Sequence, residues 1–214
     1  MRKFIDLNCD MGESYYDKII GNDEKILPYI TSCNIACGFH GGDSETISKT
    51  ILLAIQNNVK IGAHPSFHDI EGFGRRKYTL KSKELESILL YQISALKGMA
   101  ESFGAKLNHV KPHGALYNMA SIDLKIAEII VKSIKKVDPN LILYGPSMNK
   151  WKELSENHGI KYLSEVFSDR NYNDDLSLVD RKLGDAMITE PELSLEHINN
   201  MIEKGKVKTI TGKL

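Results

Sequence analysis

Strand-like and helix-like segments alternate along this chain, and that order limits its fold more than any other feature of the sequence. Six short runs show the two-residue period of a β-strand, and the segments between them carry apolar side chains at helical spacing. Such alternation predicts one sheet of parallel strands, closed or nearly closed into a β/α barrel. The strands are expected at residues 3–10, 34–40, 59–64, 106–113, 141–144 and 161–167.

Amphipathic patterns place the helices between these strands. The longest is expected over 82–103, and others are expected after Asp43, from Ser121 to Lys136, around 151–157 and over 194–204. Three of them show an apolar stripe that would face the sheet. The stripes consist of Ile47, Ile51 and Ile55; Leu85, Leu89, Ile93, Leu96, Ala100 and Phe103; and Ala127, Ile130, Val131 and Ile134.

Bulk composition excludes several classes of protein. The 214 residues have a formal net charge of zero, 42% hydrophobic and 26% charged residues, so neither nucleic acid nor an anionic membrane is indicated as a partner. No apolar run has the length of a membrane-spanning helix, and the first ten residues alternate like a strand rather than a signal peptide. Three cysteines do not complete a zinc site. We expect a reduced, cytoplasmic protein that forms one domain over residues 1–214.

The segment NIACGFHGGD, residues 34–43, stands out as a candidate functional turn. A strand ends here in three glycines that surround a histidine, and a helix follows Asp43. Glycine permits backbone conformations that turn successive N–H groups toward one point, which suits an anion or oxyanion. A tight turn with a hydrogen-bonded histidine and a helix-capping aspartate would give the same pattern. This segment alone therefore does not decide between structure and function.

Titratable residues gather where the expected strands end. In a parallel barrel these ends meet at one mouth, so residues far apart in sequence are expected to lie together. Buried together, such groups would need pairing or a ligand. Asp6, Asn8 and Asp10 share one face of the first strand, and Asn34 lies in register on the second. The strand ends carry Asp10, Glu13, His40, Asp43, His64, Lys111, His113, Glu165 and Arg170.

Three chemistries fit these residue types. The first is metal-assisted hydrolysis, with Asp10, His40, His64 or His113 as ligands. The second is metal-free acid–base catalysis, with a carboxylate or histidine that activates water and a cation that holds an oxyanion. The third is binding of a sugar or acid without catalysis. A doubly wound nucleotide-binding sheet is also possible, but no GxGxxG or GxxxxGK motif follows the first strand.

Long motifs in this chain match a known family in order and spacing. DLNCDMGES, SCNIACGFHGGD, GAHPSFHDIEGFGRR, HVKPHGALYN, EVFSDRNY and VKTITG together resemble the LamB/YcsF family over essentially the whole chain. The resemblance implies a seven-stranded β/α barrel similar to the glycoside hydrolase/deacetylase group. It also implies ATP-dependent conversion of 5-oxo-L-proline to L-glutamate as an A subunit, together with subunits B and C. ATP would be the co-substrate, handled mainly by the partners because no P-loop is present.

Candidate roles follow from this chemistry. A carboxylate among Asp6, Asp10 and Glu13, or else His40, would orient or deprotonate water. His64, Lys111 and His113 would stabilise negative charge or protonate the leaving nitrogen, and Arg170 could hold a carboxylate or phosphate as a fork. The expected substrate-binding residues are Asn8, Asn34, Gly41, Asp43, Arg75, Glu165 and Arg170. A metal-dependent amidohydrolase or deacetylase that works without ATP is the alternative.

The chain departs from the family pattern at its end. Family members usually continue past the ITG motif with a further strand, ending in a Cys-x-His-Gly-Asp-like motif, and a closing helix. This sequence ends at Leu214. The last strand and helix of the barrel are therefore expected to be missing here, which would leave one sheet edge open to swapping or association.

Overall fold

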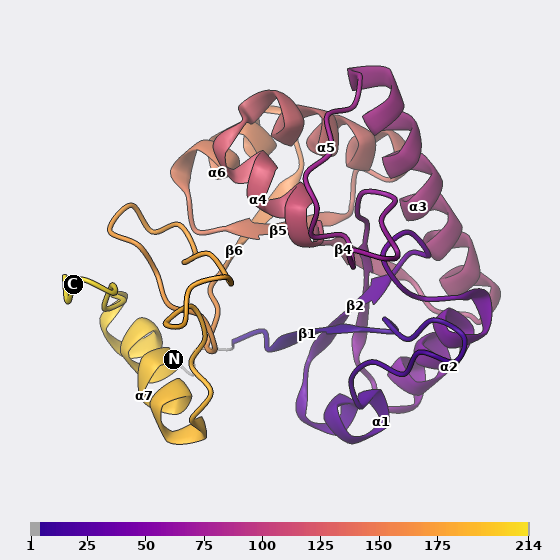
Figure 1. Ribbon diagram of the computed structural model, residues 1–214. Coiled ribbons are helices and arrows are strands. Elements are labelled where there is room, and N and C mark those ends of the chain that lie inside the picture. The colour runs from indigo at the N-terminus through magenta and orange to yellow at the C-terminus, as the bar shows by residue number, and fades with distance from the viewer. Residues whose placement is uncertain (1–4, 214) are drawn as a thin grey trace. The chain divides into compact units, whose positions relative to one another are not determined.

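Six strands form one sheet in chain order in the computed structural model, which describes residues 5–213 (Figure 1). The pairs from β1 to β5 are parallel, and the sheet curls into a half-barrel. The predicted parallel β/α fold is confirmed, with six described strands where the resemblance implied seven. Residues 3 and 4 of the first expected strand lie outside the described residues. The strands are β1 (Asn8–Met11), β2 (Ser32–Ala36), β3 (Lys60–His64), β4 (Leu107–Val110), β5 (Ile142–Pro146) and β6 (Lys161–Glu165).

The helices occupy the expected connections, with three additions and one correction. Helices α1 and α4 and the short 3-10 helix η1 were not predicted. Ser121 does not begin a helix: it lies inside α4, and Asp123 caps α5 by accepting a hydrogen bond from the backbone N–H of Lys125 at 2.9 Å. The elements are α1 (Asp23–Ile26), η1 (Leu27–Tyr29), α2 (Ser44–Gln56), α3 (Ser82–Ser102), α4 (Gly114–Ile122), α5 (Leu124–Val137), α6 (Asn149–Asn157) and α7 (Pro191–Lys204).

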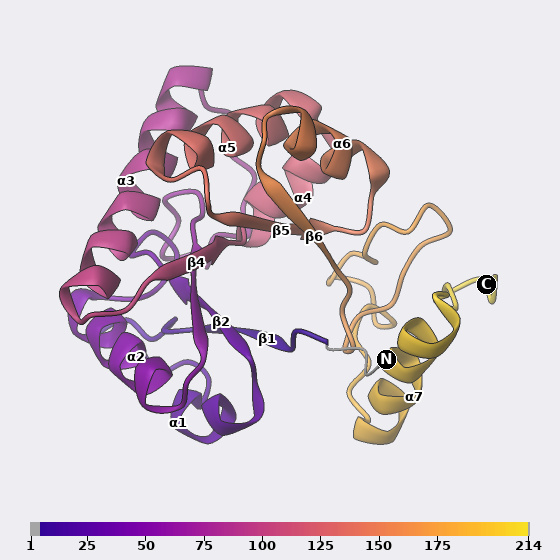
Figure 2. The same ribbon diagram turned by 180° about the vertical axis from the view of Figure 1, so that it is seen from behind.

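Alternation along the strands separates an apolar side from a polar side. Cys33 and Ile35 on β2, and Ile61 and Ala63 on β3, are buried in the apolar core. Helices α2, α3 and α5 cover this outer side of the curved sheet (Figure 2). Asn34, one position along from Cys33, contacts the polar side chains of β1 instead. The curl therefore gathers the polar residues of several strands on the inner side.

The predicted apolar stripes are buried with two exceptions. Every stripe residue of α5 and all of those inside α3 are at most 3% exposed. Phe103 is 40% exposed because it is the C-terminal capping residue of α3, where the chain leaves the helix. Ile55 in the last turn of α2 is 38% exposed. The sequence period thus predicted the helix faces correctly and failed near the helix ends.

The chain divides into two compact units, Met1–Ser164 and Glu165–Leu214. In the second, short antiparallel bridges join Arg170 to Met187 and Tyr172 to Leu178, and α7 follows. The polar segment NYNDDLSLVDRKLG, residues 171–184, is therefore held by local pairing. A single domain over residues 1–214 stays a prediction. No helix in the described part of the chain is long and apolar enough to cross a bilayer.

Candidate active site

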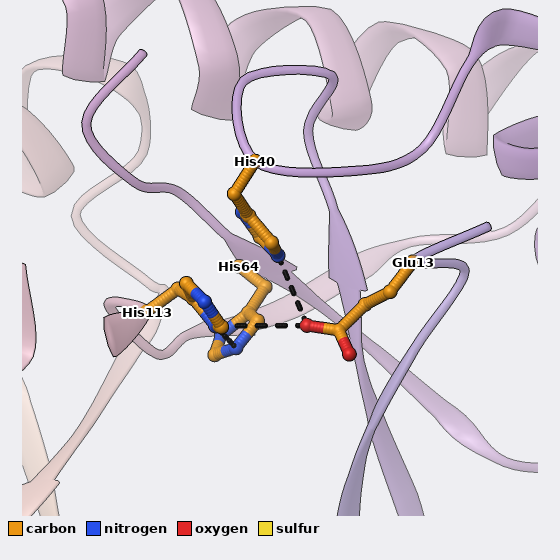
Figure 3. Close-up of side chains that lie close together, drawn as sticks. All are labelled: Glu13, His40, His64 and His113. Atoms are coloured by element: carbon orange, nitrogen blue, oxygen red, sulfur yellow. Dashed lines mark hydrogen bonds and ion pairs between the residues drawn. The ribbon is translucent and has the colours of Figure 1, made fainter. Parts of the chain in front are cut away.

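Three histidines and a glutamate meet at the carboxyl ends of the first four strands (Figure 3). His64 ends β3, and the other three, Glu13, His40 and His113, follow β1, β2 and β4. One potential ligand atom from each lies within 4.8 Å of the others. The parallel register explains the meeting, since Ala36 of β2 pairs with His64 of β3. The predicted convergence of residues 13, 40, 64 and 113 is therefore present in the structure.

In each histidine, the ring nitrogen that points away from the cluster lies within hydrogen-bond distance of an oxygen atom. His64 Nδ1 lies 2.6 Å from the carbonyl oxygen of Lys111, and His113 Nε2 lies 2.9 Å from that of Phe73. His40 Nδ1 lies 2.9 Å from Ser66 Oγ. These contacts fix the orientation of all three rings.

The inner nitrogens face carboxylates and one another. His40 Nε2 lies 3.0 Å from Glu13 Oε1, and His64 Nε2 lies 3.2 Å from Asp10 Oδ2. His113 Nδ1 is 2.9 Å from His64 Nε2 and 3.6 Å from Glu13 Oε1. The rings of His40 and His113 stack with their centroids 3.7 Å apart. The cluster can move protons or hold a divalent metal ion.

The surroundings shift the pKa values of the cluster in opposite directions. Burial and the nearby imidazole of His64 hold the pKa of His40 well below its usual range, and burial also lowers that of His113. Burial raises the pKa of Glu13. Burial alone would raise the pKa of Asp10 too, but His64 and Lys111 outweigh it and hold that pKa well below its usual range. Asp10 is therefore the group most firmly kept as a carboxylate.

A second polar network adjoins the histidines through Asp10. Lys111 Nζ donates to Asp10 Oδ1 at 3.0 Å and to Asn8 Oδ1 at 3.3 Å. Asn34 Nδ2 bridges the same two oxygens at 2.9 and 2.7 Å, and its own Oδ1 lies 2.7 Å from His109 Nε2. Asn8, Asp10, Asn34 and Lys111 were all predicted as site residues. The structure brings them together.

Two predicted site residues have structural contacts instead. Asp43 caps α2: its carboxylate accepts from the backbone N–H groups of Glu45, Thr46 and Tyr16 and from the Thr46 hydroxyl. Both of its oxygens are thus engaged, which favours the capping interpretation. Asp6 precedes β1 and binds the hydroxyls of Thr31 and Ser32 at 2.8 and 2.6 Å. The structure does not bring Asp6 to the cluster.

The remaining predicted residues have varied surroundings. A Cβ atom on Gly41 would lie 2.5 Å from the backbone oxygen of Glu13, so this glycine permits close packing beside the cluster. Arg75 is exposed, and its guanidinium lies 5.0 Å from the centre of the Phe73 ring. Arg170 is buried and donates to the carbonyls of Val179 and Ala186 within the second unit, where Glu165 is also buried. Substrate contacts by these three charged residues stay predictions.

Sequence reasoning missed several residues that support the cluster. Ser66, Phe73 and Gly74 lie in the segment GAHPSFHDIEGFGRR, from which only His64 and Arg75 were predicted as site residues. Gly74 has a φ of +65°, and a Cβ there would lie 2.7 Å from His113 Cδ2 and 2.9 Å from His40 Cβ. Two glycines beside the arginines were the available signal. His109 of β4 orients Asn34 and stacks on Tyr144, with the two ring centroids 4.0 Å apart.

Fold and site together define a parallel β/α protein with a buried histidine–carboxylate centre at its strand ends. Residues 5–214 match the LamB/YcsF family, and the chain belongs to that family. It is 48% identical to the A subunit of 5-oxoprolinase from Shouchella clausii, over 97% of this chain and 82% of that protein. Identity to the A subunit of 5-oxoprolinase from Bacillus subtilis is 45%, over 97% of this chain and 81% of that protein.

Solved structures agree with the fold. The crystal structure of the lactam utilization protein from Thermus thermophilus superposes with a TM-score of 0.91 at 39% identity, covering 96% of this chain and 83% of that chain. A putative cellobiose-phosphate cleavage protein from Enterococcus faecalis superposes with a TM-score of 0.53 at 14% identity, over 92% and 74% of the two chains. The second likeness concerns the fold alone.

Proposed function

We propose that this chain is the A subunit of a cytoplasmic, ATP-dependent 5-oxoprolinase and that its histidine–carboxylate cluster opens the lactam ring. Relatives at 45–48% identity over nearly the whole chain are named as the A subunit of 5-oxoprolinase. The observation that supports the proposed ring-opening chemistry is the cluster itself. It joins buried bases, a firmly ionised carboxylate and the ammonium of Lys111.

The reaction needs activation because an amide carbonyl is a poor electrophile. Subunits B and C would use ATP to phosphorylate the lactam oxygen and release ADP. Water then bonds to the ring carbon, the carbon–nitrogen bond breaks, and the nitrogen leaves as the amine of glutamate after it accepts a proton. A second water releases the phosphoryl group as phosphate, which completes the hydrolysis.

The residues of the cluster suit the ring-opening step. Glu13, paired with His40 Nε2 at 3.0 Å, would take the proton from the attacking water. The facing His64 and His113 would deliver a proton to the leaving nitrogen. Lys111 and Asn34 border Asp10 and would orient the substrate or stabilise developing negative charge.

The test is glutamate release by the reconstituted three-subunit enzyme. We expect His113→Ala to reduce the rate by about 100-fold or more, the usual contribution of a positioned acid or base. The matched control is His158→Ala, just after α6, whose ring lies near the Leu154 carbonyl and Glu128 and away from the cluster. Near-normal glutamate release by a folded His113→Ala variant would remove the proposal.

The donor set of the cluster also favours a second candidate, a metal-dependent amidohydrolase that needs no ATP. Three imidazoles and a carboxylate match catalytic metal sites in hydrolases. The two functions separate in one assay: 5-oxoproline and simple amides are incubated with the chain alone, and then with ATP and subunits B and C. Turnover by the chain alone would favour the amidohydrolase.

A further inference from the structure

Hydrogen bonds to backbone oxygens fix which nitrogen of His64 and His113 carries the proton. A carbonyl oxygen can only accept, so His64 must donate from Nδ1 to Lys111 and His113 must donate from Nε2 to Phe73. In the neutral rings, the lone pairs are then on His64 Nε2 and His113 Nδ1. These two atoms face each other at 2.9 Å.

The same reasoning fixes the tautomer of His40, here through the hydroxyl group of Ser66. Ser66 Oγ donates its proton to the carbonyl of Phe67 at 2.9 Å, so it accepts from His40 Nδ1. The lone pair of His40 is therefore on Nε2, and it points at Glu13 Oε1. Within the cluster, three nitrogen lone pairs and a carboxylate oxygen face one another, an arrangement that a cation among them would stabilise.

The cation has to come from outside the four donors, which are three imidazoles and one carboxylate. The ammonium of Lys111 donates to Asp10 and Asn8. A small divalent metal ion would supply a dense positive charge among the four donors.

Their geometry is that of a four-coordinate metal site. Two donors at about 2.0–2.1 Å from one tetrahedral ion lie about 3.3 Å apart. Here the closest donor pairs are separated by 2.9, 3.0 and 3.6 Å, and all fall within 4.8 Å. Ligand histidines also donate their other N–H to a carbonyl or hydroxyl, as all three do here.

We propose that Glu13, His40, His64 and His113 bind one divalent transition-metal ion of the zinc type. Three imidazole nitrogens and one carboxylate oxygen suit Zn²⁺ or Co²⁺, whereas Mg²⁺ prefers an all-oxygen site. Ser66 is a positioning residue, because it holds the His40 ring with its lone pair inward. The site shares its four residues with the proposed lactam reaction, so its test is scored by binding rather than by activity.

The experiment titrates the chelator-treated full chain with Zn²⁺ by calorimetry and with Co²⁺ by visible absorption. We expect one ion per chain and the intense visible bands of four-coordinate Co²⁺. His64→Gln should abolish binding, and the matched control His158→Gln should leave it unchanged. Ser66→Ala should weaken binding by about 10–100-fold, the usual effect of removing a partner of a ligand histidine, and Ser66→Thr should restore it.

Circular dichroism checks that every variant is folded. Mg²⁺ serves as a control ion that should not compete with Zn²⁺ or Co²⁺ for the site. Absence of Zn²⁺ and Co²⁺ binding by the wild-type chain would overturn the proposal. So would binding that survives unchanged in both His64→Gln and Ser66→Ala. Because activity is not measured, a failed metal site leaves the proposed 5-oxoprolinase reaction to be judged by its own assay.

Discussion

Two aspartates of the first strand segment, Asp6 and Asp10, show how position along a parallel strand determines the role of a carboxylate. Both share one strand face, and both were candidates for the carboxylate that activates water. Asp6 lies before β1 and binds neutral hydroxyls of Thr31 and Ser32, whereas Asp10 contacts the ammonium of Lys111 and the ring of His64. The side chain before the strand makes hydrogen bonds that support the fold, whereas charged side chains cluster at the carboxyl end of the strand. Residue type and face alone do not distinguish them.

Glu13, at the carboxyl end, provides the largest expected effect. We expect Glu13→Gln to lower the rate of glutamate release by about 100-fold or more, because it removes the proposed base. Since burial raises the pKa of Glu13, the wild-type rate should fall with decreasing pH at a higher pH than an ordinary glutamate would give. That acidic limb should disappear in the variant. Glu71→Gln on an exposed side chain is the control, and an equal loss there would contradict the assignment.

Gly74 tests whether the loop packed on the histidines has a specific role. Gly74→Ala places a Cβ against His113 and His40 at a φ of +65°, whereas Gly104→Ala meets open space at a φ of +78°. Both should cost about 1–3 kcal/mol of unfolding free energy from backbone strain. Only Gly74→Ala should also reduce activity, by about 10-fold or more, because it displaces catalytic rings. Equal activities in the two variants would show that the loop only supports the fold.

Asp43 gives a smaller, purely structural effect. Burial raises its pKa, but hydrogen bonds from Thr46, Tyr16 and Glu45 outweigh this and lower it to about 2. A depressed folded-state pKa stabilises the protein above the unfolded value near 4, and this contribution is lost as the pH falls toward 2. Asp43→Ala should cost about 0.5–2 kcal/mol at neutral pH, measured by urea unfolding, with the difference vanishing near pH 2. A loss independent of pH would contradict the capping role.

Much of the fold and part of the site could be predicted from the sequence, for identifiable reasons. Strand alternation and the apolar stripe of α5 depend on local periodicity, and both are present in the folded protein. The meeting of His40, His64 and His113 followed from parallel strands sharing one end. The tautomer-fixing contacts of Ser66 and Phe73 depend on how a long loop folds back, which no period encodes. The role of Asp43 could not be decided from the sequence, because capping and ligand-binding aspartates at a glycine-rich turn have the same sequence signature.

The most direct test of this account compares Asp10→Asn with Asp6→Asn in the reconstituted enzyme. Both changes remove one charge from the same strand face and keep nearly the same shape. The account predicts that Asp10→Asn lowers glutamate release by about 100-fold or more, while Asp6→Asn stays within about twofold of wild type once folding is verified. Equal losses in the two variants would contradict the claim that the carboxyl ends of the strands form the reactive centre.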